Sequence, residues 1–468
     1  MKNKLKVFLA ALAIGSMTLS SCGLFDVENI QELNNPTVES VLTGATAAQI
    51  SQLGVGVQRV MPSGYVDLSQ FGGSIGREIV LFNGTDNRYY TELQGQIPID
   101  AAGIFYPWYG ALNQTRRRAE LFYLSANNSL DLTAAQKKAC EGFAKTVQAY
   151  AMLNLTNMMG ETGIRTTFGD LQSKGDLLNP GPFVSYAEAL TYCKKLVDEG
   201  STALDAGGTA FPFPMATTAW SGFNTPANFK KFNRAVAARV AMYQKDWATM
   251  QTALNASFLD LNGAMTTGPN FLYSTQTGDN TNGFFKALND VVNPQAIQNA
   301  NIADVEAGDK RFTGTAIRAG GTSKVSLRTA PVTKGGFTAS THEYQAYATN
   351  VSPISIIRNE ELILMQAEVQ IQAGTLPAAV IALDKVRAAA GLPALATAKP
   401  TIIADKAKLT DELLNQRRYS LFMEGSHRWF DMRRYDKLAS LPKDLPTHNV
   451  VKAFAKPQSE IDWDNRPK

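Results

Sequence analysis

Cysteine and histidine are scarce in this chain: three of each occur in 468 residues. So few cysteines cannot form a disulfide framework, and no two histidines have the i, i+4 spacing of a helical metal site. A nucleophile elbow, a phosphate-binding loop and a Rossmann glycine fingerprint are also missing from the sequence. The pattern therefore indicates no catalytic centre, no metal and no cofactor. A carboxylate pair for glycoside hydrolysis stays open, because its separation is spatial and not sequential.

A surplus of one charge is lacking as well. Lys and Arg total 45 and Asp and Glu total 41, a net charge of +4. This near balance argues against a nucleic-acid-binding protein, which usually concentrates basic residues on one face. The hydrophobic share of 44% is ordinary for a globular protein and sufficient for a packed core.

Long hydrophobic runs are absent except at the N-terminus, where Lys2, Lys4 and Lys6 precede apolar residues 7–19. This apolar segment is too short to span a bilayer and is typical of an export signal. The tetrapeptide Leu-Ser-Ser-Cys that ends at Cys22 resembles the bacterial lipobox, in which the cysteine becomes acylated after cleavage. Acyl chains at that position hold a protein on a membrane.

The N-terminal pattern therefore predicts a signal peptide over residues 1–21, lipidation at Cys22 and a polar tether over residues 22–44. A secreted protein with an incidental cysteine and an uncleaved anchor are the alternatives. The other two cysteines, Cys140 and Cys193, lie in segments with helical spacing, and whether they pair stays open.

The rest of the chain is predicted to be mainly α-helical, because apolar residues recur at helical spacing. Helix hairpins are expected near 106–159, 187–255 and 357–390, and the last two resemble tetratricopeptide repeats. The segment 83–104 is expected to be a loop, and an irregular insert is expected near 260–350. Short strands are expected only at positions such as 79–82 and 325–327.

The densest pattern is the segment 413–435, which reads LLNQRRYSLFMEGSHRWFDMRRY. Glu424 precedes Arg428 by four residues, the favoured order for a helical ion pair if one helix runs through Gly425. Asp431 is expected to be stabilised as a carboxylate by the arginines around it, which are Arg428, Arg433 and Arg434. A core ion-pair network is the favoured interpretation, and a sugar or phosphate site is the alternative.

With these residues the chain resembles the SusD/RagB family of outer-membrane nutrient-uptake lipoproteins. The late family motif is matched by Arg417, Arg418, Leu421, Phe422, Glu424, Gly425, Arg428, Trp429, Asp431 and Arg433. The departures from it are Gln416, Ser420 and the additional Ser426. Further matches, in the family's order, are the lipobox, Gly308 to Arg311, Arg358 to Glu361 with Ala367-Glu368 and Val386-Arg387, Ala390 to Leu392, and Pro457 to Ile461.

The resemblance implies a non-catalytic lipoprotein on the outer-membrane surface. Such a protein captures glycans or other oligomeric nutrients, peptides included, and delivers them to a SusC-like TonB-dependent channel. It implies a body of tetratricopeptide-like hairpins with a loop-rich ligand-binding face, formed by early loops and by the irregular insert. The matching segments contain the candidate ligand residues Tyr65, Asp67, Asp86, Asn87, Arg88, Tyr89, Tyr90, Trp108, Trp220, Phe271 and Tyr273.

Two other classes of protein stay open on the sequence. A lipid-anchored glycoside hydrolase would need two carboxylates in one cleft. A helical-repeat adhesion protein would bind another surface protein without a small ligand. Each candidate aromatic residue also has an ordinary alternative role as part of the core.

Overall fold

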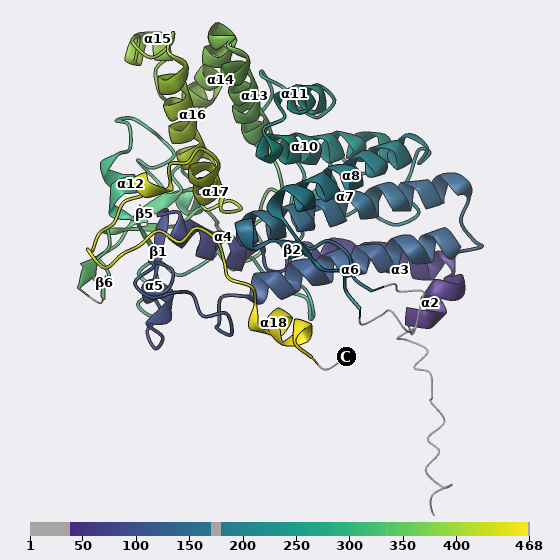
Figure 1. The fold of residues 1–468 in the computed structure, drawn as a ribbon. Coiled ribbons are helices and arrows are strands. Elements are labelled where there is room, and N and C mark those ends of the chain that lie inside the picture. The colour runs from purple at the N-terminus through teal and green to yellow at the C-terminus, as the bar shows by residue number, and fades with distance from the viewer. Residues whose placement is uncertain (1–37, 170–178, 335, 467–468) are drawn as a thin grey trace, which may run out of the picture.

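Helices make up most of the described chain, with few short strands between them, and the predicted mainly α fold class is confirmed (Figure 1). The computed structural model describes residues 38–169, 179–334 and 336–466. The predicted signal peptide and the predicted lipidation site, Cys22, lie outside these ranges.

The helices before residue 260 are α2 (Val38–Gly44), α3 (Ala47–Val60), α4 (Tyr65–Ile75), α5 (Arg88–Thr91), α6 (Pro107–Asn128), α7 (Ala134–Met159), α8 (Tyr186–Asp205), α9 (Thr217–Trp220), α10 (Pro226–Gln244) and α11 (Trp247–Asn255). The later helices are α12 (Asn299–Ala303), α13 (Asn359–Ala373), α14 (Leu376–Ala389), α15 (Leu395–Ala398), α16 (Lys406–Ser420), α17 (His427–Arg434) and α18 (Gln458–Asp464). The strands are β1 (Ile79–Leu81), β2 (Ile164–Arg165), β3 (Phe183–Val184), β4 (Gln295–Ile297), β5 (Val325–Leu327), β6 (Thr333–Lys334), β7 (Phe337–Thr338) and β8 (His342–Tyr344).

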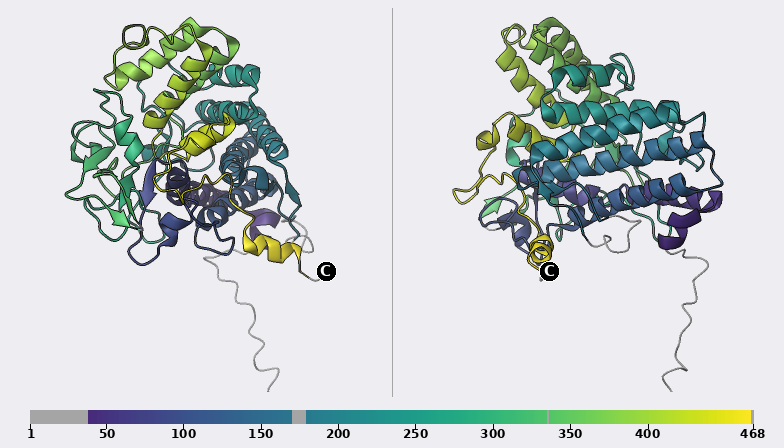
Figure 2. Two further views of the ribbon diagram at one scale, coloured as in Figure 1. Left: turned by 60° about the vertical axis from the view of Figure 1, so that its left-hand side comes forward. Right: turned by 45° about the vertical axis from the view of Figure 1, so that its right-hand side comes forward.

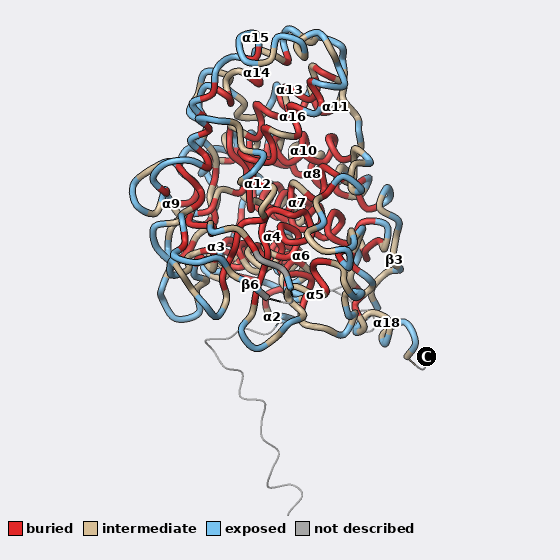
Figure 3. Tube along the Cα trace, turned by 90° about the vertical axis from the view of Figure 1, so that its left-hand side faces the viewer, coloured by how far each residue is buried: buried red, intermediate tan, exposed pale blue. Residues whose placement is uncertain are grey.

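The long helices α3, α6, α7, α8 and α10 lie side by side in one stack (Figures 1 and 2). The starts of three of them, α3, α7 and α8, are fixed by capping boxes in the local sequence. The hydroxyls of Thr133 and Ser185 accept hydrogen bonds from the backbone N–H groups of Gln136 and Glu188, and the latter two side chains accept from the N-cap backbone in return. These capping boxes satisfy N–H groups that a helix start otherwise leaves without a partner. Buried residues run through the middle of the stack, and most exposed residues lie on the surrounding loops and outer surfaces (Figure 3).

The helices α13 and α14 form a hairpin over the segment 357–390. Gly374 ends α13 with φ of 79°, a left-handed conformation that glycine adopts without strain. Pro377 lies in the first turn of α14, where its missing N–H costs nothing. Ala367 and Ala379 pack in a separate hydrophobic cluster that includes residues of α16.

The irregular segment 260–350 contributes three strands to a four-stranded antiparallel sheet of order β1-β4-β8-β5. Its first strand comes from the early part of the chain: Ile79 of β1 lies opposite Ile297 of β4. The edge strand β5 coincides with the predicted strand 325–327. The sheet therefore joins β1, which lies just before the segment 83–104, to the insert on one side of the helical stack (Figure 2).

Two segments that the sequence predicted to be irregular contain a helix. The end of the predicted tether is the helix α2, whose Val41 and Leu42 are buried. The Nδ2 of Asn128 donates a hydrogen bond of 2.9 Å to the backbone oxygen of Leu42. The segment 83–104 contains the short helix α5, on which the ring of Tyr89 packs against aromatic side chains of the core.

The two remaining cysteines do not form a disulfide. Cys140 and Cys193 are both buried and unpaired. Burial raises the pKa of each thiol to about 12. Both residues are therefore core side chains.

Candidate functional site

The signature segment 413–435 folds as two helices, α16 and α17, with a turn between them. Gly425 and Ser426 in this turn have φ of 58° and 62°. The turn is bound to α4: the N–H of Gly425 donates to Ser69 Oγ at 3.0 Å, and Ser426 Oγ donates to the backbone oxygen of Leu68 at 2.7 Å. The end of the chain thus packs on its beginning.

The ion pair predicted between Glu424 and Arg428 is not formed, because the turn interrupts the helix that it requires. Glu424 instead contacts Nζ of Lys324 at 3.0 Å and also the guanidinium of Arg358. Arg428 is half-buried, and burial together with the nearby Arg418 lowers its pKa to about 10.

Asp431 lies between two arginines, in agreement with the prediction that arginines stabilise its carboxylate. Of these two, Arg434 was predicted and Arg417 was not. Its oxygens lie 2.6 Å from Nε of Arg417 and 2.9 Å from Nε of Arg434. The predicted neighbours Arg428 and Arg433 make no ion pair with it among the contacts of the described chain. Burial raises the pKa of Asp431, but the two guanidiniums outweigh this effect and hold the pKa at about 2.

Most other signature residues also act within the core. The guanidinium of Arg433 lies 5.1 Å from the ring centroid of Trp429, which is buried and donates from Nε1 to the backbone oxygen of Val451 at 2.9 Å. Arg418 contacts Asp304 at 3.0 Å. These contacts favour the ion-pair network over a sugar or phosphate site at α17.

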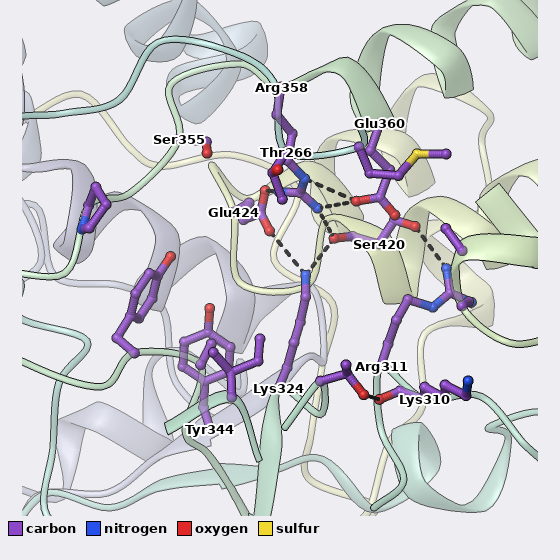
Figure 4. Close-up of a pocket in the computed structure, with 18 residues that line it drawn as sticks. Thr266, Lys310, Arg311, Lys324, Tyr344, Ser355, Arg358, Glu360, Ser420 and Glu424 are labelled. Carbon is purple, nitrogen blue, oxygen red and sulfur yellow. Dashed lines mark hydrogen bonds and ion pairs between the residues drawn. The ribbon is translucent and has the colours of Figure 1, made fainter. Parts of the chain in front are cut away.

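Glu424 is different because it lines a cavity of about 360 Å³ (Figure 4). Four lining side chains form a continuous chain of contacts, in the order Lys324, Glu424, Arg358 and Glu360. Nη2 of Arg358 lies 2.7 Å from Oε2 of Glu360. Lys324 and Arg358 both donate to the backbone oxygen of Ser420. We call this space the ion-pair cavity.

Aromatic residues form another part of the wall of the ion-pair cavity, namely Tyr344 of β8 and Tyr347. Three of the predicted ligand residues lie near them. Tyr65 contacts Phe271 at a centroid distance of 4.8 Å. Burial raises the pKa of Tyr65, and the nearby Glu424 and Tyr347 raise it further.

Burial likewise raises the pKa of Tyr273, which lies close to Tyr150. Tyr65, Phe271 and Tyr273 are all buried, with exposed fractions of 5%, 3% and 8%. The structure brings these three side chains together beside the cavity, but it leaves them almost no exposed surface.

Beyond the sheet, the segment 83–104 also contacts the insert. We call this region the loop surface and define it as residues 83–92 and 282–293. The N–H of Gly84 donates to the backbone oxygen of Val292 at 2.7 Å. The side chains of Asn83 and Asn293 form a hydrogen bond of 2.9 Å.

The predicted ligand residues at the loop surface are partly accessible. Asn87 is exposed, and Asp86 and Arg88 form an ion pair of 2.6 Å that is partly open to solvent. Tyr89 and Tyr90 are half-buried. Their rings pack on the core, Tyr89 on Phe105 at 5.2 Å and Tyr90 on Phe82 at 5.9 Å.

Asp67 on α4 lies near this surface. Burial raises the pKa of its carboxyl group, and the charge of Lys286, from the insert, opposes the shift. Burial raises the pKa of Tyr89, and the carboxyl of Asp67 raises it further. The structure therefore groups Asp67 with the cluster Asp86 to Tyr90.

Five predicted ligand residues require a correction, and the two tryptophans among them are the most completely buried. Trp108 is 0% exposed and packs on Phe454 at 5.1 Å, and Trp220 is 2% exposed and packs on Phe229 at 5.4 Å. Neither ring has a face open to a ligand, because the surrounding side chains cover both rings. Trp108, Trp220 and the buried trio of Tyr65, Phe271 and Tyr273 are core aromatics in this structure.

Sequence reasoning missed most of the ion-pair cavity. Lys324, Tyr344 and Tyr347 lie in the irregular insert, where no periodicity singled them out. Arg358 and Glu360 were noted only as part of a family motif. The one available signal was that this motif places two opposite charges at the start of a helix, directly before a buried segment.

A profile described as the SusD family matches residues 222–468. The chain belongs to the SusD family. No curated protein sequence matches it significantly.

Solved structures of SusD family proteins have the same fold. A SusD superfamily protein from Bacteroides vulgatus ATCC 8482 is 16% identical, with a TM-score of 0.62 over 90% of this chain and 98% of that one. The surface glycan-binding protein A from Bacteroides thetaiotaomicron, in complex with laminarihexaose, is 13% identical, with a TM-score of 0.63 over 90% and 98%. A laminarin-binding SusD-like protein is 16% identical, with a TM-score of 0.60 over 89% and 98%. At these identities the likeness shows the fold.

Within the residues that the structure describes, no helix of this SusD family chain is both long and apolar enough to cross a membrane. Within the same ranges, no group of three or more His, Cys, Asp or Glu side chains is arranged to hold a metal ion.

Proposed function

We propose that this SusD family protein is a non-catalytic lipoprotein of the outer-membrane surface. It captures a glycan or another oligomeric nutrient and delivers it to a partner TonB-dependent channel. Membership of the SusD family is the observation that carries the proposal. The laminarihexaose complex of one structural relative supports a glycan as the first ligand to test.

The loop surface is the proposed ligand-binding face. It combines a carboxylate, a carboxamide and a guanidinium at Asp86, Asn87 and Arg88 with the partly exposed rings of Tyr89 and Tyr90. Sugar hydroxyls bind to the first three groups, and the apolar C–H face of a sugar packs on an aromatic ring. Because these rings are already packed on the core, they are held in place before a ligand arrives.

Glu360, a carboxylate that lines the ion-pair cavity, does not have the pKa shift that a catalytic acid needs. Glu360 and Glu424 are both bound by Arg358. Burial raises the pKa of Glu360, but Arg358 and Lys324 outweigh it, and the net shift is downward. The general acid of a glycoside hydrolase needs the opposite shift, toward neutral pH.

Anchoring through acyl chains on Cys22 is part of the proposal. The first experiment is affinity isolation of the tagged protein from native outer membranes in mild detergent, followed by identification of the co-isolated proteins. We expect a TonB-dependent channel in near-equal amount. A Cys22→Ser variant controls for lipidation and is expected to leave the membrane fraction. Recovery of a lipidated protein alone, with turnover of oligosaccharides, would instead support a hydrolase.

The assignment of the ligand face has its own test. A Tyr89→Ala, Tyr90→Ala double variant is expected to lose glycan binding and to keep its association with the channel. The matched control is the Tyr89→Phe, Tyr90→Phe variant, which retains both rings. Dissociation of the alanine variant from the channel, with glycan binding intact, would show that the two faces are assigned the wrong way round.

A further inference from the structure

Glu78 is a buried carboxyl group outside the ion pairs of the cavity. It lies between α4 and β1 and is 1% exposed. Its backbone is fixed, because its N–H donates to the oxygen of Gly73 at 2.8 Å and its oxygen accepts from the N–H of Gln298 at 3.0 Å. The guanidinium of the adjacent Arg77 is used on backbone oxygens, such as that of Asn449 at 2.8 Å. The carboxyl group is therefore held in the core, where the early chain meets the insert.

The two oxygens of this carboxyl group have different surroundings. Oε1 accepts a hydrogen bond of 3.2 Å from the backbone N–H of Met423. Oε2 is buried, and no atom of the described residues gives it a hydrogen bond. A carboxylate accepts several hydrogen bonds in water, so its burial with a single one is costly. This environment disfavours the ionised form of Glu78.

Charged side chains approach Glu78 from the elements packed around it. Arg428 of α17 and Lys324, directly before β5, favour its ionised form, and Glu424 opposes it. Lys324 is held by Glu424 at 3.0 Å, and no ion pair within the described ranges joins Arg428 to Glu78. Tyr344 of β8 also faces it: burial raises the pKa of this phenol, and the charges of Glu424 and Glu78 raise it further. The carboxyl group thus has charged neighbours but no paired counter-charge.

The N–H that Glu78 binds belongs to a strained turn, residues 421–426, which we call the signature turn. Met423 and Ser426 in this turn have φ of 61° and 62°, left-handed values that residues other than glycine rarely adopt. Such a backbone persists only where the surrounding contacts hold it in place. Here the contacts are the hydrogen bond to Glu78 and the two hydrogen bonds from the turn to α4.

Glu78 and the signature turn also share one closely packed contact with α4. A Cβ on Gly73 would lie 2.7 Å from Sδ of Met423 and 3.1 Å from Oε2 of Glu78. Both groups therefore occupy the space that a side chain at this position of α4 would fill. Because the side chain of Met423 packs at the same place as Oε2, solvation of an ionised Oε2 requires the turn to move.

We propose that Glu78 is a pH-sensitive switch for the signature turn. While its carboxyl group is neutral, the turn stays packed on α4. When the group loses its proton, the turn opens and water reaches the carboxylate. Opening also moves Glu424, the residue after Met423, away from Lys324 and Arg358, so the wall of the ion-pair cavity is rearranged. The switch does not depend on which ligand the protein binds.

The direction of the pH effect follows from burial. Burial raises the pKa of Glu78 from 4.5 to about 8, although the N–H of Met423, Arg428 and Lys324 all lower it. The unfolded chain loses this proton near pH 4.5, and the folded chain holds it until about pH 8. The contribution to stability is therefore complete below pH 4.5 and is lost as the pH rises through 8.

The test compares the wild type with Glu78→Gln, which keeps the shape of the side chain and an acceptor for the N–H of Met423 but has no proton to lose. Glu39→Gln, at an exposed glutamate of α2, is the matched control. Hydrogen exchange of the purified protein, followed by mass spectrometry, measures the opening of the signature turn between pH 6 and pH 9. Each exchange rate is divided by the intrinsic rate at that pH, and the peptide 47–60 of α3 serves as an internal reference.

We expect the corrected exchange of the turn in the wild type to increase at least about tenfold from pH 6 to pH 9. In Glu78→Gln it is expected to stay constant within about twofold, whereas Glu39→Gln is expected to behave as the wild type. The α3 peptide is expected to remain better protected than the turn at every pH, because opening of the turn leaves the helical stack folded. Urea unfolding supplies an independent measurement: the midpoint of the wild type is expected to fall relative to that of Glu78→Gln as the pH rises.

Two results would overturn the inference. Equal pH dependence in the wild type and Glu78→Gln would show that Glu78 does not control the turn. Equal exchange of the turn and of α3 would show that pH acts on global unfolding instead. If Glu78→Gln does not fold, the wild type alone decides, since a corrected exchange rate of the turn that is independent of pH rejects the switch.

Discussion

The buried ion pair between α10 and α13 allows a sharp prediction about stability. Nε and Nη2 of Arg239 lie 2.8 and 2.6 Å from the two carboxylate oxygens of Glu361, and Nη2 also donates to the backbone oxygen of Ile356 at 3.2 Å. The two side chains are only 6% and 4% exposed. The substitution Arg239→Met keeps the apolar stem and removes the guanidinium, which leaves Glu361 buried without its main partner.

The cost follows from the general behaviour of buried pairs: removal of one partner costs about 3–5 kcal/mol, because the other charge stays buried without compensation. The direction of the pKa of Glu361 agrees with this, since burial raises it but Arg239, together with His427 and Arg417, outweighs burial and lowers it to about 2. We therefore expect Arg239→Met to lower the free energy of unfolding by about 3–5 kcal/mol at pH 7.

The pH dependence gives the prediction a second test. In the wild type the pKa of Glu361 is lower in the folded state, so its contribution is complete above pH 4.5 and is lost as the pH falls toward 2. In Arg239→Met, burial acts without this guanidinium and raises the pKa of Glu361, so protonation at low pH relieves the unpaired charge. The difference in stability between wild type and variant must therefore shrink as the pH is lowered.

Urea unfolding at pH 7 and at pH 4.5 measures both effects. The double variant Arg239→Met, Glu361→Leu removes both charges and is expected to recover most of the lost stability, since apolar replacements of a buried pair are often neutral. Lys194→Ala breaks an exposed pair with Asp198 on α8 and serves as the control, with an expected cost below about 1 kcal/mol. A cost below about 1 kcal/mol for Arg239→Met at pH 7, or a cost that grows at low pH, would refute the reasoning.

Other predictions concern packing and reactivity. Gly72→Ala is expected to destabilise the protein by about 1–3 kcal/mol, because its Cβ would lie 2.0 Å from Oγ of Ser426 in the signature turn. Gly110→Ala, on the exposed side of α6 with nothing within 4 Å, is the matched control and is expected to stabilise by about 0.5–1 kcal/mol; thermal unfolding compares the two. Cys140 and Cys193 are expected to resist an aromatic disulfide reagent at pH 8 in the native protein and to react fully in denaturant, because burial raises the pKa of both to about 12. Rapid labelling of the native protein would show that α7 and α8 open far more readily than this packing implies.

Some aromatic side chains show what sequence patterns could not determine. Tyr89 and Trp108 lie in neighbouring segments and both read as candidates for ligand contact. The structure leaves Tyr89 half-buried at the loop surface and encloses Trp108 completely. Which face of a segment is covered depends on helices and loops far away in the chain, so local spacing alone could not separate these two residues.

The sequence by itself determined the features that depend on local order. The spacing of apolar residues predicted the helices, because an α-helix turns once every 3.6 residues whatever surrounds it, and the motifs near the C-terminus indicated the family. The tertiary structure alone decided the partners of the charges. Glu424 lies four residues from Arg428, yet it binds Lys324 and Arg358, which are 100 and 66 positions away. Helix α16 ends at Ser420, so Glu424 lies in the turn of residues 421–426 and shares no helix with Arg428 of α17. Packing of the insert beside the start of α13 places the other two cations next to the carboxylate, where the ion-pair cavity forms.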